Sequence, residues 1–274
     1  MLDSHPALAI PGEDEFLLAE LEAATPFATG RRIAAEEVEA RLSTHRSTSD
    51  VLGGALAAAT DVTLPEWFRL AYSRYARSFG KERYGDKTPG LVAHISTLSE
   101  MLPEAVFVHV LRDGRDVAGA FLDQPWGPKT VSAAARTWKR LVDAGRRSGA
   151  AIGPERYVEV RYEALVEEPE PILRGLCGAL ALDFDPTMLD YRGSATRAIA
   201  ASPYPDSHDR LLEPPTTGLR DWRVDMALVD RMRFETIAGD SLRGAGYDLW
   251  TPSIARVAVR AGRSARARLS RTRG

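Results

Sequence analysis

The chain has 274 residues, with 36 basic against 38 acidic side chains and a formal net charge of −2, and 44% of its residues are hydrophobic. A chain of this length and composition can bury a large core and suits one α/β domain. The single cysteine excludes an internal disulfide framework, and the sequence has neither an apolar run of about 18 residues nor a signal-peptide pattern. These features exclude a disulfide-stabilised scaffold and a membrane-spanning chain, and we expect a cytoplasmic protein.

The charge is unevenly distributed along the chain. Residues 251–274 hold seven arginines and no acidic residue, which leaves 29 basic against 38 acidic groups, or −9, in residues 1–250. We therefore predict one domain over 1–250 and an Arg-rich tail over 251–274 that makes weak contacts with anionic partners. Because a body with a charge of −9 repels polyanions, no specific nucleic-acid binding is expected.

Hydrophobic periodicity predicts helices first and then an alternation of helices and strands. The predicted helices cover residues 13–24, 33–42, 64–79, 91–102, 115–124, 132–147 and 226–243, and the predicted strands cover 83–85, 105–111 and 157–161. Helix 64–79 is expected to place Trp67, Leu70, Ala71 and Tyr75 on one face. Residues 83–111 resemble a βαβ unit, and residues 198–223 a long irregular loop. The alternation predicts a parallel sheet flanked by helices.

The strand at 105–111 breaks abruptly into the charged turn Arg112-Asp113-Gly114-Arg115-Asp116, which opens a helix. Ligands of parallel sheets bind outside the carboxyl ends of the strands, and a helix N-terminus offers N–H groups to an anion. An arginine at this point can add a bidentate clamp for a phosphate. The alternative is that Arg112 pairs with Asp113 or Asp116 and only orders the turn.

Three further segments give this turn a context: residues 84–89 read Tyr-Gly-Asp-Lys-Thr-Pro, 158–165 read Val-Glu-Val-Arg-Tyr-Glu-Ala-Leu, and 246–249 read Gly-Tyr-Asp-Leu. In this order and at these intervals, the set resembles the sulfotransferases that use 3′-phosphoadenosine-5′-phosphosulfate (PAPS), in particular bacterial members akin to the tyrosylprotein and heparan sulfate enzymes. The resemblance runs from about Met1 to Leu249. It implies a P-loop NTPase-like fold and sulfuryl transfer to a hydroxyl or amine of a small molecule, saccharide or protein, with PAPS as co-substrate and no metal.

The resemblance also implies catalytic roles. Lys87, in the family's Lys-Thr-Pro segment, would stabilise the bridging oxygen of the leaving group; the alternative is a surface lysine paired with Asp86. His5-Pro6 followed by Gly12 and Glu13 is similar to the family's His-Pro stretch leading into Gly-Glu. Glu13 is then the candidate general base, with Asp14 as a close rival. The alternative is that these acids only favour the first turn of a helix.

For the 3′-phosphate of PAPS, the resemblance implies Arg112 and a serine eight residues later, but position 120 is Ala120. We expect compensation from Arg115 or from the late loop, where Thr217 and Arg220 are the candidates.

A Gly-rich phosphate-binding loop, which precedes the Asp-x-His-Pro stretch in this family, is absent from the sequence. We therefore expect that the natural protein starts upstream of Met1 and that the first strand and the loop lie in the missing segment. One alternative is a non-catalytic remnant of the fold that binds a nucleotide or a partner. Another is a P-loop kinase for small molecules, which would need a Walker lysine and a magnesium-binding carboxylate that we do not identify.

Overall fold

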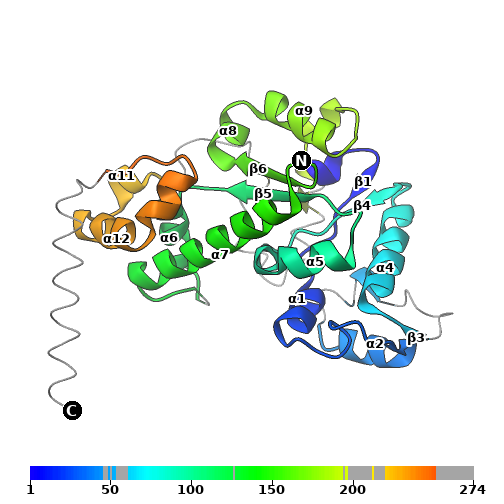
Figure 1. The fold of residues 1–274 in the computed structure, drawn as a ribbon. Coiled ribbons are helices and arrows are strands. Elements are labelled where there is room, and N and C mark those ends of the chain that lie inside the picture. The colour runs from blue at the N-terminus through cyan, green and yellow to red at the C-terminus, as the bar shows by residue number, and fades with distance from the viewer. Residues whose placement is uncertain are drawn as a thin grey trace, which may run out of the picture. The chain divides into compact units, whose positions relative to one another are not determined.

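The structure is a computed structural model that describes residues 1–45, 49, 51–53, 61–125, 127–193, 195–196, 212 and 220–250 (Figure 1). The chain forms two compact units. Unit 1 comprises residues 1–106 and 169–215, and unit 2 comprises residues 107–168 and 216–274. The Arg-rich tail over 251–274 lies outside the described residues. The division into a domain over 1–250 and a tail stays a prediction.

Unit 1 combines helices with two small sheets. Its elements are η1 (Leu2–Ser4), β1 (Leu8–Ala9), α1 (Glu15–Glu22), β2 (Ile33–Ala34), α2 (Ala35–Leu42), β3 (Asp61–Val62), α4 (Leu64–Ser78), β4 (Arg83–Tyr84), η2 (Pro89–His94), α5 (Ile95–Met101), α9 (Pro169–Ala179) and η3 (Pro186–Leu189). Strand β1 pairs with β4 in parallel, and β2 pairs with β3 antiparallel. Strands β1, β2 and β3 were not predicted, because two residues are too short to show an alternating pattern.

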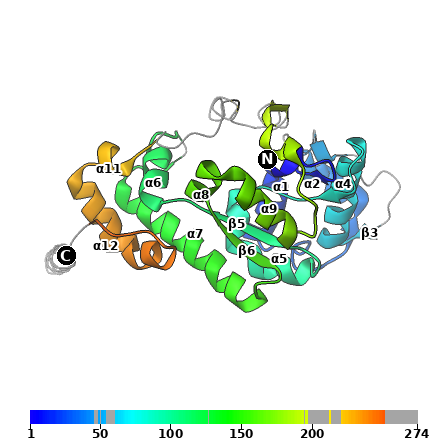
Figure 2. The same cartoon turned by 90° about the horizontal axis from the view of Figure 1, so that it is seen from above.

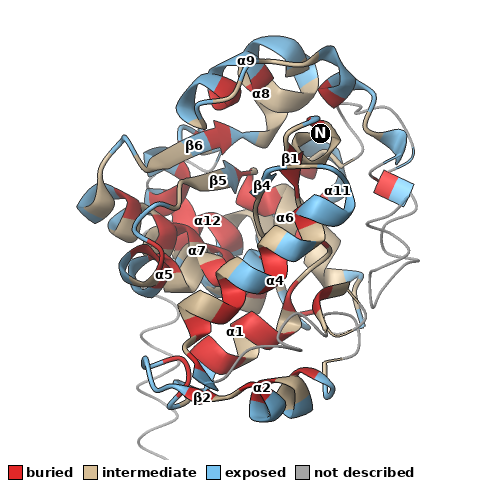
Figure 3. Ribbon diagram, turned by 90° about the vertical axis from the view of Figure 1, so that its right-hand side faces the viewer, coloured by how far each residue is buried: buried red, intermediate tan, exposed pale blue. Residues whose placement is uncertain are grey.

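Helix α4 supplies much of the core of unit 1. It begins where predicted, because Thr63 and Glu66 form a capping box. Its buried face includes Trp67, Phe68 and Tyr72, whereas Leu70 is 45% exposed. The buried face of the helix is therefore rotated relative to the predicted one, because aromatic neighbours decide which side of the helix is covered. Figure 3 shows buried residues in red along α4 and α1.

Unit 2 is built on one pair of strands and three main helices. Its elements are β5 (Phe107–Leu111), α6 (Gly114–Leu122), α7 (Val131–Ile152), β6 (Tyr157–Arg161), α8 (Tyr162–Glu167), α11 (Trp222–Asp225) and α12 (Leu228–Gly244). Strands β5 and β6 are parallel and in register from Phe107 opposite Tyr157 to Leu111 opposite Arg161. This confirms both predicted strands and their parallel direction; their direct pairing was not predicted.

Helix α7 is the centre of unit 2, and α6 and α12 pack against it (Figure 2). Trp138 of α7 and Phe234 of α12 lie in this core with ring centroids 5.9 Å apart. Gly114 at the start of α6 makes the close packing possible, because a Cβ there would lie 2.5 Å from the Trp138 ring and 2.7 Å from the Phe234 ring. Close packing of these aromatic rings against the start of α6 therefore favours glycine at this position of the charged turn.

One prediction of the sheet topology is wrong. Strand β4 hydrogen-bonds to β1 and strand β5 to β6, so the predicted βαβ unit does not join β4 and β5 in one sheet. Their pairing partners come from distant parts of the chain, which local periodicity does not reveal.

Among the described residues, no helix is both long and apolar enough to cross a membrane.

Candidate functional site

Two side chains of opposite charge meet at one edge of a sheet in unit 1. Lys87 Nζ lies 2.6 Å from Glu13 Oε1. Glu13 stands shortly before α1, and Lys87 shortly after β4. Because β1 and β4 run parallel, with Ala9 opposite Tyr84, the segments that follow them leave the sheet at the same edge. The structure brings together the predicted base and the predicted cation, and it pairs Lys87 with Glu13 instead of Asp86.

The sequence neighbours of this pair, Asp14 and Asp86, meet at the buried hydroxyl of Tyr72. The hydroxyl oxygen lies 2.7 Å from Asp14 Oδ2 and 2.7 Å from Asp86 Oδ2. Asp14 also caps α1, since its Oδ1 accepts a hydrogen bond from Leu17 N at 2.9 Å. Its own N–H donates to Thr88 Oγ1 at 2.7 Å. For Asp14, the structure supports the helix-capping alternative over the general base.

The two contacts of Tyr72 require two protons, and the phenol supplies one. Burial and, after it, the charge of Asp14 raise the pKa of Asp86 to about 7, against hydrogen bonds from Tyr72 and Thr88 that lower it. Burial, followed by the two carboxylates, also raises the pKa of Tyr72 well above its ordinary value. Both contacts are satisfied when one of the two carboxyl groups is protonated and donates to the Tyr72 oxygen while the phenol donates to the other carboxyl group.

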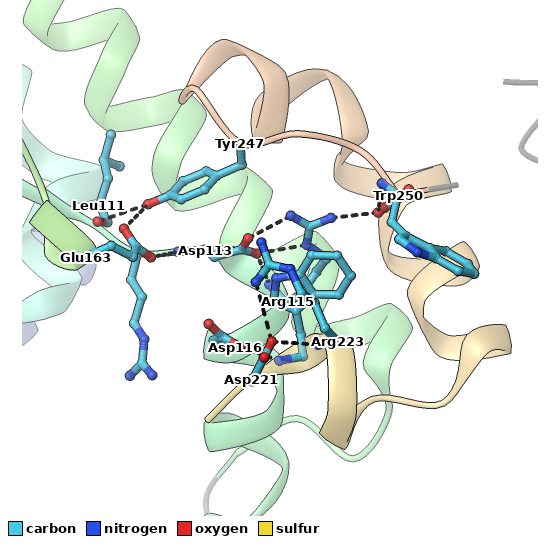
Figure 4. A network of polar contacts seen from close by, with 12 residues as sticks. Leu111, Asp113, Arg115, Asp116, Glu163, Asp221, Arg223, Tyr247 and Trp250 are labelled. Atoms are coloured by element: carbon cyan, nitrogen blue, oxygen red, sulfur yellow. Dashed lines mark hydrogen bonds and ion pairs between the residues drawn. The ribbon is translucent and has the colours of Figure 1, made fainter. Parts of the chain in front are cut away.

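In unit 2, the carboxyl ends of β5 and β6 form the second candidate region. Strand β5 leads into Asp113 and strand β6 into Glu163, and Asp113 N–H donates to Glu163 Oε1 at 2.9 Å. The hydroxyl oxygen of Tyr247 lies 2.9 Å from Glu163 Oε2 and 3.2 Å from the Leu111 carbonyl. The turn and the Gly-Tyr-Asp-Leu segment are therefore parts of one network, as Figure 4 shows.

Arg112 lies at the same end of the strands. Its Cζ atom lies 4.7 Å from the centre of the Tyr162 ring, a cation–π contact. Within the described part of the chain, no carboxylate forms an ion pair with this guanidinium, and Asp113 pairs with Arg115 instead. No ion pair between Arg112 and Asp113 or Asp116 is therefore observed, although the charge of Arg112 acts to lower the pKa of Asp116.

Arg115, in contrast, is buried in an ion-pair network of unit 2. Its Nη2 lies 2.7 Å from Asp113 Oδ2, and its Nη1 lies 2.7 Å from Glu235 Oε1 (Figure 4). The guanidinium also stacks on the Trp222 ring, 3.6 Å from its centre. The Arg115 side chain is 1% exposed, so it presents no accessible cation to a phosphate.

Asp116, one residue on, is only half-buried. Its Oδ1 accepts a hydrogen bond from Trp222 N at 2.8 Å. Burial raises the pKa of its carboxyl to about 6, against the lowering effect of that backbone hydrogen bond. Asp116 therefore ties α6 to α11.

The remaining predicted residues concern the face of α6. Ala120 is half-buried on this helix. Arg220 forms an ion pair with Asp123 at the end of α6, and its Nη1 lies 3.4 Å from the position that a Cβ on Gly119 would occupy. The structure thus places Arg220 beside the segment that carries Ala120. Thr217 lies outside the described residues.

Sequence reasoning missed three residues of these regions: Tyr72, Tyr162 and Glu163. The last two stand directly after a predicted parallel strand, a position that is a usable signal, because such strand ends meet at one edge. Tyr72 gave no comparable signal, since an aromatic residue at helical spacing is typical of core. In the part of the chain that the structure describes, no group of three His, Cys, Asp or Glu side chains is arranged to hold a metal ion.

A family model matches a large part of the chain. The model described as "Sulfotransferase family" covers residues 1–186, about two thirds of the chain. The match includes Glu13, Lys87 and Arg112.

Individual relatives are more distant. Nodulation protein NoeE of Sinorhizobium fredii is 28% identical over 209 residues, which are 65% of this chain and 48% of NoeE. The chain therefore matches about half the length of that curated relative. Among solved structures, a sulfotransferase domain from the curacin biosynthetic pathway superposes with a TM-score of 0.52 at 14% identity, over 90% of this chain and 92% of that domain. A sulfotransferase domain from the olefin synthase of Synechococcus PCC 7002 gives a TM-score of 0.50 at 20% identity, over 89% and 94%. These similarities show a shared fold.

Proposed function

Because the chain belongs to the sulfotransferase family, we propose that it transfers a sulfuryl group from PAPS to a hydroxyl or amine acceptor. The acceptor would be a small molecule, a saccharide or a protein, and the single buried cysteine, Cys177, favours a cytoplasmic location. The fold of the two solved sulfotransferase domains agrees with this family.

The observation that carries the proposal is the contact between Glu13 and Lys87 in unit 1. The side chains are 31% and 57% exposed, respectively, so both can reach a bound molecule. An exposed ion pair stabilises a protein by only about 0 to 1 kcal/mol. A substrate can therefore separate the two charges at little cost, and each charge then acts on a different reacting group.

The chemistry needs these two residue types. Glu13 takes the proton from the acceptor hydroxyl through a carboxylate oxygen while that hydroxyl oxygen bonds to sulfur. The bond between sulfur and the bridging phosphate oxygen breaks, and Lys87 Nζ stabilises the negative charge that develops on that oxygen. The products are the sulfated acceptor and adenosine 3′,5′-bisphosphate. The donor supplies the sulfuryl group, and the two residues supply the proton transfer and the charge compensation.

In unit 2, we propose Arg112 as the ligand of the 3′-phosphate of PAPS. It is a cation without an ion pair among the described residues, and its Cζ lies 4.7 Å from the centre of the Tyr162 ring. Arg220 is the second candidate, because it lies beside the α6 segment that carries Ala120. Its existing ion pair with Asp123 would have to open. Arg115 is left out of this site because two carboxylates and Trp222 enclose it. Thr217 stays a prediction.

A second candidate function is a binding module that holds the nucleotide without turnover. Ala120 favours it, because the hydroxyl that the resemblance implies at this position is absent. A small-molecule kinase is not carried forward, since the matching family consists of sulfotransferases.

The test combines turnover with binding. The chain is incubated with ³⁵S-labelled PAPS and, in turn, a saccharide, a tyrosine peptide and a small alcohol, and calorimetry measures the affinity for adenosine 3′,5′-bisphosphate. Lys87→Ala should lower kcat far more than it weakens nucleotide binding, because the charge that Lys87 meets develops in the transition state. Arg112→Ala should weaken nucleotide binding by about 1.5 to 3 kcal/mol.

Two matched variants control for the loss of a surface charge. Lys129→Ala removes another exposed lysine, and Arg174→Ala removes another arginine stacked on an aromatic ring, that of Phe184. Both should behave as the unmodified chain does. Nucleotide binding without label transfer to any acceptor would favour the binding module. Absence of nucleotide binding would refute the use of PAPS.

A further inference from the structure

Buried hydrogen bonds join the residues that stand next to Glu13 and Lys87 in the chain. Asp14 and Asp86 are the chain neighbours of Glu13 and Lys87, and both hydrogen-bond to the hydroxyl of Tyr72 at 2.7 Å. The N–H of Asp14 also donates to Thr88 Oγ1 at 2.7 Å. The two segments that carry the charged pair are therefore fastened to each other one residue away from it.

Tyr72 itself has little freedom to move. It is fully buried on α4, its ring stacks on Phe68 with centroids 4.1 Å apart, and the Tyr84 ring lies 6.2 Å away. Packing thus fixes the hydroxyl at one point, and the two carboxylates converge on that point from α1 and from the segment after β4. A fixed hydroxyl that hydrogen-bonds to both segments sets their separation.

We propose that Tyr72 is a positioning residue: by bridging Asp14 and Asp86 through its buried hydroxyl, it holds Glu13 and Lys87 at the separation that catalysis uses. The proposal rests on the proposed function for its catalytic consequence only. The bridge itself follows from proton counting, since two short contacts to one hydroxyl need one carboxyl proton in addition to the phenolic one.

The bridge also gives the pair a pH dependence. The groups that face Asp86 are Asp14 at the start of α1, Tyr72 on α4 and Thr88 in its own segment. Since the pKa of Asp86 is raised to about 7 by burial and then by Asp14, Asp86 loses its proton as the pH rises through that value. The Tyr72 hydroxyl then faces two carboxylates and can donate to only one of them. The other contact has no proton, and the two negative charges push the segments that carry Asp14 and Asp86 apart.

The first experiment measures transfer kinetics of Tyr72→Phe, with Tyr84→Phe as the matched control in the same aromatic cluster. We expect kcat to fall about 10-fold or more in Tyr72→Phe with little change in nucleotide affinity, since a displacement of about 1 Å costs on the order of 10²-fold. Asp86→Asn, which can still donate to Tyr72, should remove the fall in kcat above about pH 7. Equal kcat values for Tyr72→Phe and Tyr84→Phe would overturn the proposal.

A second experiment does not depend on activity. The chain has only four lysines, so the ¹³Cε signal of Lys87 in lysine-labelled protein can be identified by its loss in Lys87→Ala. We expect Tyr72→Phe to move this signal in the direction in which Glu13→Gln moves it, and Tyr84→Phe to leave it in place. Raising the pH from about 6 to about 8 should move the Lys87 signal of the unmodified chain in the same direction as Tyr72→Phe does. In Asp86→Asn the same change of pH should leave the signal in place.

Failure of the proposed function and failure of the positioning role of Tyr72 give different results. A Lys87 signal that responds as expected in a chain without sulfuryl transfer would refute the proposed function and leave Tyr72 as the positioning residue of the charged pair. A Lys87 signal that is insensitive to Tyr72→Phe would refute the positioning role even in an active enzyme.

Discussion

Replacing Asp86 by asparagine should make the stability of the protein less dependent on pH. Burial and the nearby Asp14 raise the pKa of Asp86 from its ordinary 3.8 to about 7. Between these values the folded chain binds a proton that the unfolded chain has released. The stabilisation from this group is therefore complete below about pH 4 and is lost as the pH rises to about 7. Asparagine does not titrate, so the variant lacks this loss.

The structure also sets the size of the effect. The interval from 3.8 to about 7, at about 1.4 kcal/mol per pH unit, gives an upper limit of about 4 kcal/mol. Relaxation around the Tyr72 bridge reduces this figure, and we expect a difference of about 1 to 3 kcal/mol. The free energy of unfolding of Asp86→Asn minus that of the unmodified chain should grow by this amount from about pH 4 to about pH 7 and then stay constant.

Urea unfolding at several pH values measures this difference directly. Glu100→Gln, which neutralises an exposed carboxylate on α5, controls for the removal of one negative charge. If the difference between Asp86→Asn and the unmodified chain does not change with pH, the carboxyl of Asp86 is not held neutral and the proton count at Tyr72 is incorrect.

Three further substitutions test unit 2. Glu235→Gln leaves the buried Arg115 with one carboxylate fewer and should destabilise the chain by about 3 kcal/mol in urea unfolding; a loss below about 1 kcal/mol would contradict the buried network. Gly114→Ala should lower Tm, because a Cβ 2.5 Å from the Trp138 ring costs about 1 to 3 kcal/mol, more than the gain in helix propensity; an unchanged or higher Tm would argue against the close packing. Ala120→Ser should strengthen binding of adenosine 3′,5′-bisphosphate by on the order of 1 kcal/mol in calorimetry, and an unchanged affinity would place the 3′-phosphate away from this face of α6.

The sequence by itself predicts the helices and the two main strands of this protein with fair accuracy. The periodicity of residues 64–79 and the capping box at Thr63 determine α4, and the apolar runs at 105–111 and 157–161 determine β5 and β6. These signals are local, because hydrogen bonds and caps within a helix join residues three or four positions apart. The charged turn after β5 was likewise visible as a candidate site.

Only the tertiary structure decides which side chains of that turn are accessible. Arg112 and Arg115 look equivalent in sequence, yet one stacks on Tyr162 without an ion pair among the described residues and the other is enclosed by Asp113 and Glu235. Glu235 lies 120 residues from Arg115 along the chain. No local pattern encodes such a partner.

The same reason applies to the charged pair of unit 1. The sequence named Glu13 and Lys87 as candidates, but their contact across 74 residues depends on the parallel pairing of β1 and β4, two strands of two residues each. Tyr72 reads as an ordinary core residue, and it becomes a bridge only because the fold brings Asp14 and Asp86 to its hydroxyl. Residue types and short-range order were determined by the sequence, whereas the burial, the proton sharing and the long-range contacts were decided by the tertiary structure, because they depend on segments that are distant in the chain and adjacent only after folding.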